Sequence, residues 1–97
     1  IERAGGAAGE KMWRLPLDDE YAEQIKSPVA DMKNTGGAPA GAITAAKFIQ
    51  NFAGDTPWAH LDIAAIDMTG SDAGVNVRGN TGRPLRTLVH FVAGRAK

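Results

Sequence analysis

The chain has 97 residues, of which 43% are hydrophobic and 23% are charged, a balance typical of one globular domain with a modest core and not of a disordered or fibrous chain. Eleven Lys and Arg residues balance eleven Asp and Glu residues, so no net charge attracts nucleic acid or an anionic membrane. The absence of Cys excludes a disulfide framework, a thiolate metal site and a Cys nucleophile. No apolar run approaches the roughly 18 residues of a membrane span. We therefore expect a cytoplasmic protein whose partners include neither nucleic acid nor a membrane.

The first half of the chain predicts a helix, a short extended segment and a loop. The opening residues resemble the middle of a helix and lack a start Met, which suggests a chain cut from something longer. An Asx cap and acidic residues predict a helical stretch from Asp18 to about Lys26, which Ser27-Pro28 ends. A short extended segment, Val29–Met32, and a turn-rich loop over 33–39 follow.

The second half predicts a helix, a strand, a loop and a final helix. Small and apolar residues at helical spacing predict a half-buried helix over about 40–53 that Gly54 ends. Alternating polar and apolar residues predict a strand over 58–64, and a polar loop over 67–77 follows. An apolar stripe predicts a helix over about 82–93. This order is that of an α/β chain, but one or two strands cannot bury both helices, so we expect the other strands to lie outside the chain.

His60 and Asp62 lie two residues apart on one face of the predicted strand. Such a pair serves as two metal ligands or as a base and its orienting partner, but equally as a His held by hydrogen bonds at a sheet edge. Because a metal site needs three or four ligands and no third has a suitable spacing, we favour the hydrogen-bonded His.

Two glycine-containing loops and one acidic run have simple structural interpretations. Asn34–Gly37 precedes a helix and offers N–H groups to an anion, yet it lacks the Lys of a P-loop and is better explained as a turn or a close backbone approach. Arg78–Arg83 is a basic loop that we interpret as a helix cap, with Thr81–Pro84 at the helix start. Asp18–Glu20 is expected to be a solvated helix start. No nucleophile elbow accompanies the Ser and His residues, so a catalytic triad has no support.

Five strings of residues, in this order and spacing, resemble the leucyl aminopeptidase (cytosol aminopeptidase) family. They are Trp13–Leu17; Ser27 with Ala30–Gly37; Ala40-Gly41 with Ile43–Ala46 and Phe48; Pro57–Ala64; and Thr81–Pro84 with Arg86–Leu88. The resemblance covers about residues 9–92. It implies the C-terminal part of a three-layer α/β/α catalytic domain with a mixed sheet, spanning residues 1–97 and incomplete at its N-terminal side.

The resemblance also implies an activity, cofactors and partners. The complete enzyme would be a cytoplasmic metalloprotease that hydrolyses N-terminal residues of leucine type from peptides, with two divalent ions, zinc or manganese, and would form a hexamer. The family's strongest metal-ligand string, Asn-Thr-Asp-Ala-Glu-Gly-Arg, is absent here and is expected upstream of Ile1. We therefore predict no catalytic or metal-binding residue in this chain, no metal bound by the chain alone and no activity without the upstream segment.

Three positions match substrate-binding positions of that family. Thr35 corresponds to the leaving-residue side of the cleft, Ala64 to a wall of the pocket for the N-terminal side chain, and Asp67 to a neighbouring position that is apolar in familiar members. Ala65 replaces a Gly usual in the family, which can turn this loop so that Asp67 points to water instead. Gly79–Gly82 also departs from the usual string.

A non-catalytic function is the alternative to an enzyme. The chain would then be a separate module derived from the family that associates with itself or with a larger partner. The sequence before Ile1 separates the two hypotheses, because the metal-ligand string there establishes the enzyme and an adjacent start codon supports the module.

Overall fold

The computed structural model describes residues 1–96, which form two compact units. The first unit combines Ile1–Arg14 with the chain from Asp62 onward, so it joins the two ends of the sequence. The second unit consists of Leu15–Leu61. None of the helices formed by the described residues is long and apolar enough to cross a membrane.

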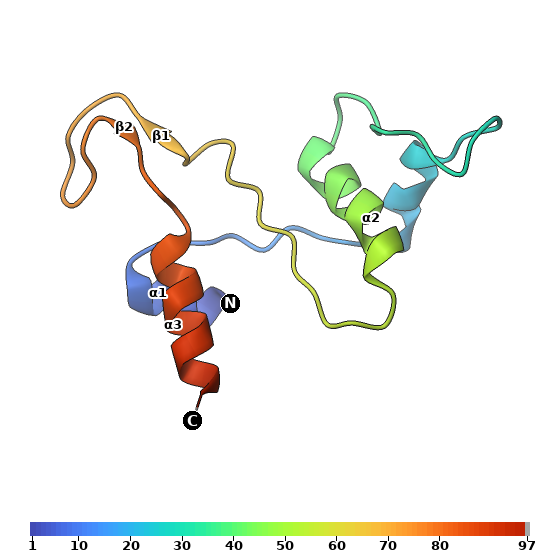
Figure 1. The fold of residues 1–97 in the computed structure, drawn as a ribbon. Helices are drawn as coiled ribbons and strands as arrows, with labels where there is room; N and C mark the ends of the chain where they lie inside the picture. Colours follow the sequence, from blue (N-terminus) through green and yellow to red (C-terminus); the bar gives the residue numbers. More distant parts are fainter. Residues whose placement is uncertain (97) are drawn as a thin grey trace. The chain divides into compact units, whose positions relative to one another are not determined.

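In the first unit, two helices from opposite ends of the chain pack together. They are α1 (Glu2–Ala8) and α3 (Leu85–Arg95), which lie side by side in Figure 1. Gly9 ends α1 in the left-handed conformation at φ 70°, and the Glu10 N–H donates to the Gly5 carbonyl at 2.8 Å. A Cβ at Gly5 would lie 2.7 Å from the Glu10 carbonyl oxygen, so only glycine allows this tight exit. The opening residues, whose sequence resembles the middle of a helix, are helical from Glu2 onward.

A short hairpin over residues 68–80 precedes α3 in the first unit. Its strands are β1 (Met68–Thr69) and β2 (Gly79–Asn80), which pair antiparallel with Met68 opposite Asn80. The prediction of a simple loop over 67–77 was therefore incomplete, because it missed this pairing. Two-residue strands carry no alternation of apolar and polar side chains that a sequence pattern can detect.

In the second unit, η1 (Asp19–Ile25) packs against α2 (Gly41–Ala53). Figure 1 shows them adjacent, η1 in blue and α2 in green. The buried side chains of this unit include Ile25, Ala46 and Thr44. A Cβ at Gly36 would lie 2.7 Å from the Thr44 methyl carbon, so the loop before α2 approaches the helix through a glycine. The predicted helix over 40–53 is confirmed.

The predicted helix over 18–26 is a 3₁₀ helix, and its cap differs from the expected one. Asp18 occupies the N-cap position, but its side chain makes no capping hydrogen bond. Immediately after the helix, the Ser27 hydroxyl accepts hydrogen bonds from the Val29 and Ala30 N–H groups. These bonds bend the backbone, so the extended segment predicted for Val29–Met32 is a series of bends instead.

The strand predicted over 58–64 is wrong for the structure of this chain. Residues 57–63 adopt neither helix nor strand, and 64–66 form a turn. The alternation of apolar residues is present, but strand formation requires a neighbouring backbone for hydrogen bonding, and among residues 1–96 only β1 and β2 pair as a sheet. The pattern indicates a propensity for strand formation, but residues 58–64 have no strand to pair with among residues 1–96.

The final helix is shifted from the predicted range of 82–93. It begins at Leu85, after Pro84, and passes through Gly94 to end at Arg95. Its apolar stripe of Leu85, Leu88, Val89 and Val92 remains 40–65% exposed, as do Ile49 and Phe52 on α2 at 47% and 71%. Both helices therefore present apolar surface that the described residues leave uncovered.

Candidate substrate-pocket wall

Ala64 and Asp67 lie on one turn of backbone between Asp62 and β1. The N–H groups of Ile66 and Asp67 both donate to the Ile63 carbonyl, at 2.9 and 3.0 Å. The Asp62 carboxylate accepts from the Ala64 N–H at 3.0 Å and so caps the first residues of the turn. We call residues 63–67 the wall turn. Both Ala64 and Asp67 are exposed on it.

Thr81 holds the other end of the wall turn. Its N–H donates to the Asp67 carbonyl at 2.8 Å, and its hydroxyl donates to the Ile66 carbonyl at 2.6 Å. The hydroxyl also accepts from the Arg83 N–H at 3.3 Å. The wall turn is thus tied by Asp62 at its start and by Thr81 at its end.

Thr35 belongs to the second unit, whereas Ala64 and Asp67 belong to the first. Its side chain is exposed, and its hydroxyl accepts from the Gly37 N–H at 3.2 Å. Gly37 has a φ of 94°, a conformation that favours glycine. Of the two interpretations of Asn34–Gly37, a turn or a close backbone approach, the contact of Gly36 with Thr44 confirms the second.

A buried polar cluster of the first unit, centred on Glu10, was not predicted from the sequence. The Glu10 carboxylate is only 4% exposed and accepts from the Thr87 N–H at 2.9 Å, the Thr87 hydroxyl at 2.7 Å and the Arg86 Nε at 3.2 Å. Burial alone would raise the pKa of Glu10, but the hydrogen bonds from Thr87 and the contact with Arg86 outweigh it and hold the pKa below its usual value. Glu10 is therefore a buried, ionised carboxylate.

Glu10 replaces the local cap that was predicted for the last helix. Thr81–Pro84 was expected to cap that helix, but Pro84 is the N-cap residue and provides no side-chain bond. Thr87 is the third residue of α3, and its N–H is one of those left free at a helix start. The Glu10 carboxylate binds this N–H from 77 residues away. No local sequence signal could reveal a cap at that separation.

Asp18–Glu20 was predicted to be a solvated helix start, but Asp19 forms an ion pair with Lys47. The buried Lys47 ammonium lies 2.9 Å from the Asp19 carboxylate, which itself faces solvent. The hydrogen bond from Lys47 and its charge lower the pKa of Asp19. The periodicity of the helix over 40–53 did not reveal that Lys47 points toward η1.

The donor sets of this chain do not fit a pair of divalent metal ions. Asp62 uses one carboxylate oxygen to cap the wall turn, and His60 is exposed on a segment that forms no strand. Among residues 1–96, no three His, Asp or Glu side chains gather as metal ligands would. These side chains therefore offer no site for two divalent ions.

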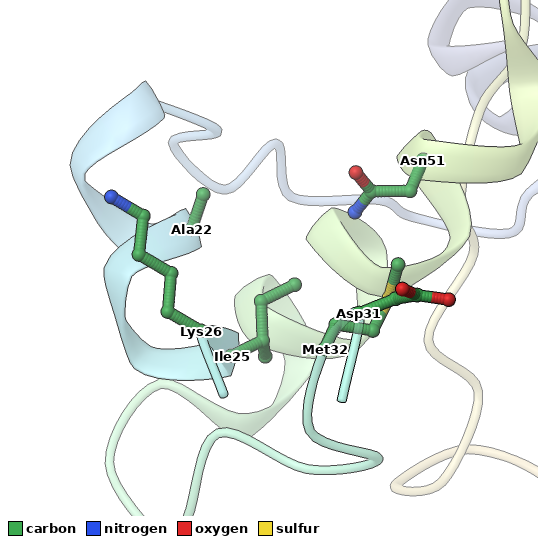
Figure 2. A pocket seen from close by; sticks show the side chains of 6 residues that line it. All are labelled: Ala22, Ile25, Lys26, Asp31, Met32 and Asn51. Carbon is green, nitrogen blue, oxygen red and sulfur yellow. The ribbon is translucent and has the colours of Figure 1, made fainter. Parts of the chain in front are cut away.

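A shallow hollow of about 160 Å³ lies in the second unit. Figure 2 shows Ala22, Ile25 and Lys26 on one side, Asp31 and Met32 on the loop that follows η1, and Asn51 projecting from α2. This volume is smaller than the roughly 300–1,000 Å³ of typical ligand pockets, and none of the three predicted site residues lines the hollow.

Comparison with known proteins identifies the family. Residues 1–89 match the cytosol aminopeptidase family, catalytic domain. A probable cytosol aminopeptidase of Acidovorax ebreus is 57% identical over 93 residues, which are 96% of this chain and 18% of that protein. One from Synechocystis sp. is 53% identical over 97 residues, covering the whole of this chain and 20% of the relative. The chain therefore spans about a fifth of the length of these curated relatives.

A solved structure shows the same fold. A mutant of tomato leucine aminopeptidase superimposes with a TM-score of 0.81 at 41% identity, over 93% of this chain and 17% of that one. This agreement confirms the predicted fold class, part of an α/β catalytic domain. Because the family match covers most of the chain and the relatives are this similar, the chain belongs to the cytosol aminopeptidase family.

Proposed function

We propose that these residues form the C-terminal part of the catalytic domain of a two-metal aminopeptidase that removes N-terminal residues from peptides in the cytosol. The match of residues 1–89 to the family's catalytic domain supports this activity most strongly. In this proposal the chain supplies scaffold and one wall of the substrate pocket. The metal-ligand residues and the water-activating groups belong to the segment upstream of Ile1.

The wall turn is the part of the chain that contacts substrate in this proposal. Ala64 lines the pocket for the N-terminal side chain, and its small size leaves room for a leucine-type residue. Asp67 lies at the far end of the same turn, where its carboxylate attracts an N-terminal Arg or Lys. Its exposure and the absence of an ion-pair partner for it among residues 1–96 support this role, because the carboxylate is free to meet a cation. Thr35 lines the leaving-residue side of the cleft.

The exposed apolar faces of α2 and α3 support incorporation into a larger domain. The stripe of Leu85, Leu88, Val89 and Val92 has the i, i+3, i+4, i+7 spacing of a helix that packs on a core. In the complete domain this stripe covers a mixed sheet, with helices on both faces, and residues 58–64 find the strand partners that they lack here. The complete enzyme assembles as a hexamer, in line with the resemblance.

A substitution that fills the pocket tests the proposed function. In the complete protein, Ala64→Phe places an aromatic ring where the N-terminal side chain of the substrate binds. Because the ring fills that space, kcat/KM for a leucyl anilide should fall at least tenfold, which corresponds to about 1.4 kcal/mol. Ala73→Phe makes the same change in the exposed loop of the hairpin and serves as the control.

Two outcomes of this experiment would contradict the proposal. Equal kinetics of Ala64→Phe and the parent protein would exclude Ala64 from the pocket. An absence of metal-dependent leucyl anilide hydrolysis by the complete protein itself would favour the non-catalytic module. In that case the exposed helix faces would serve association with a partner.

A further inference from the structure

We propose that Thr81 is a positioning residue that sets the specificity of the pocket by fixing the wall turn. This inference rests on the proposed function, because it assumes that Ala64 and Asp67 contact the N-terminal residue of the substrate. Thr81 itself contacts no substrate in this proposal. It acts through the backbone of residues 66 and 67.

The bonding pattern distinguishes Thr81 from its neighbours in the hairpin. The pairing of β1 with β2 places Met68 opposite Asn80, and the bond from the Thr81 N–H to the Asp67 carbonyl extends this pairing by one residue. The hydroxyl then reaches one residue further, to the Ile66 carbonyl at 2.6 Å. The backbone bond from Thr81 ends at Asp67, and no backbone N–H of the hairpin donates to the Ile66 carbonyl, so at Ile66 the wall turn is held by the Thr81 hydroxyl.

The other end of the wall turn is already fixed by its own residues. Asp62 caps the Ala64 N–H, and the Ile63 carbonyl accepts from Ile66 and Asp67. Loss of the Thr81 hydroxyl therefore releases the Ile66 carbonyl, next to Asp67, and leaves the backbone bonds around Ala64 in place. A pocket wall displaced by a fraction of an ångström changes substrate orientation, and the cost depends on the side chain being recognised.

The matched pair Thr81→Val and Thr81→Ser tests this role in the complete protein. Valine keeps the shape and removes the hydroxyl, whereas serine keeps the hydroxyl. We expect Thr81→Val to raise KM for an arginyl anilide about 3- to 10-fold, the equivalent of one hydrogen bond, and to change the ratio of arginyl to leucyl kcat/KM at least about threefold. Thr81→Ser should stay within about twofold of the parent on both substrates.

Thr69→Val provides the control within the same hairpin. The Thr69 hydroxyl donates to the Ser71 carbonyl at 2.9 Å, a comparable bond that does not involve the wall turn. Its loss should leave the substrate ratio unchanged. If Thr81→Val fails to fold, Thr81→Ala removes the same hydroxyl, and hydrogen exchange across residues 63–69 reports on release of the turn.

The outcomes separate failure of this inference from failure of the proposed function. An unchanged substrate ratio in Thr81→Val, while Ala64→Phe impairs leucyl turnover, would overturn the role of Thr81 alone. Equal impairment of Thr81→Ser and Thr81→Val would also overturn it, because the hydroxyl would then not be the active group. Unchanged kinetics in Ala64→Phe would overturn the pocket wall and this inference together.

Discussion

Glu10 shows how one carboxylate organises the start of a distant helix. It accepts two hydrogen bonds from Thr87 and one from Arg86, so an N–H left free at the start of α3 and two side chains have a common partner. A charged acceptor at a helix N-terminus also opposes the positive end of the helix dipole. Glu10, the second residue after α1, thereby ties the end of that helix to α3.

Replacement of Glu10 should destabilise the first unit. Glu10→Gln keeps the shape but removes the charge, and we expect a loss of about 1–2 kcal/mol, because hydrogen bonds to charged groups are stronger than those to neutral ones. Glu10→Ala leaves Thr87 and Arg86 without a partner and should cost about 2–4 kcal/mol. Urea unfolding of the complete protein measures both, with the exposed Glu2→Gln as control. Equal midpoints for Glu2→Gln and Glu10→Ala would contradict this account.

The same contacts predict how stability depends on pH. The pKa of Glu10 is lower in the folded chain than its ordinary value of 4.5, so the unfolded chain takes up a proton first as the pH falls. The contribution of Glu10 is therefore complete above about pH 5 and is lost as the pH falls through the folded pKa. Unfolding midpoints between pH 3 and 7 should decline less steeply in Glu10→Gln than in the parent protein. A parallel decline in both would show that Glu10 is not the titrating group.

Among the elements, the approach of the loop to α2 depends on Gly36. A Cβ there would lie 2.7 Å from the Thr44 methyl carbon and 2.9 Å from its hydroxyl oxygen. Thr44 is buried, so it has little space to move aside.

Gly36→Ala should lower the free energy of unfolding by about 1–3 kcal/mol, the usual cost of overpacking. Gly70→Ala is the matched control, since a Cβ at Gly70 meets no atom within 4 Å. Urea unfolding of the complete protein measures both. The account would be wrong if both variants unfolded at the same midpoint.

The elements differ in how well the sequence predicts them, for a physical reason. The helix over 41–53 was predicted almost to the residue, because its apolar spacing and its final glycine are local signals. The strand over 58–64 was not found in this chain, because its pattern is local but its hydrogen-bond partners are not. The same distinction explains why the Glu10–Thr87 bond, across 77 residues, escaped prediction.

The candidate site was predicted in part. Residues Ala64 and Asp67 were selected by family resemblance, and the structure places them on one turn. Their roles remain predictions, as does that of Thr35 in the other unit. The hydrogen bond from the Thr81 hydroxyl to the Ile66 carbonyl could not be predicted, because the two residues are 15 positions apart in the chain.

At the scale of the whole molecule, the 97-residue chain should not catalyse peptide hydrolysis alone. Its described residues assemble no set of three metal ligands, whereas hydrolysis in this proposal requires two bound metal ions that activate a water. Leucyl anilide hydrolysis by the purified chain with zinc or manganese should equal a metal-only blank. Addition of the upstream segment should restore turnover if the two pieces assemble. Hydrolysis above the blank by the chain alone would refute this prediction.

The substrate ratio of Asp67→Met tests the central claim that the wall turn lines the pocket of an aminopeptidase. A carboxylate in a partly desolvated pocket favours an N-terminal Arg or Lys by about 1.5–3 kcal/mol, whereas one in open solvent contributes about 0–1 kcal/mol. In the complete protein, kcat/KM for arginyl relative to leucyl anilides should therefore fall tenfold or more when Asp67 is replaced by Met. An unchanged ratio would place Asp67 in solvent, outside the pocket, and would contradict the claim.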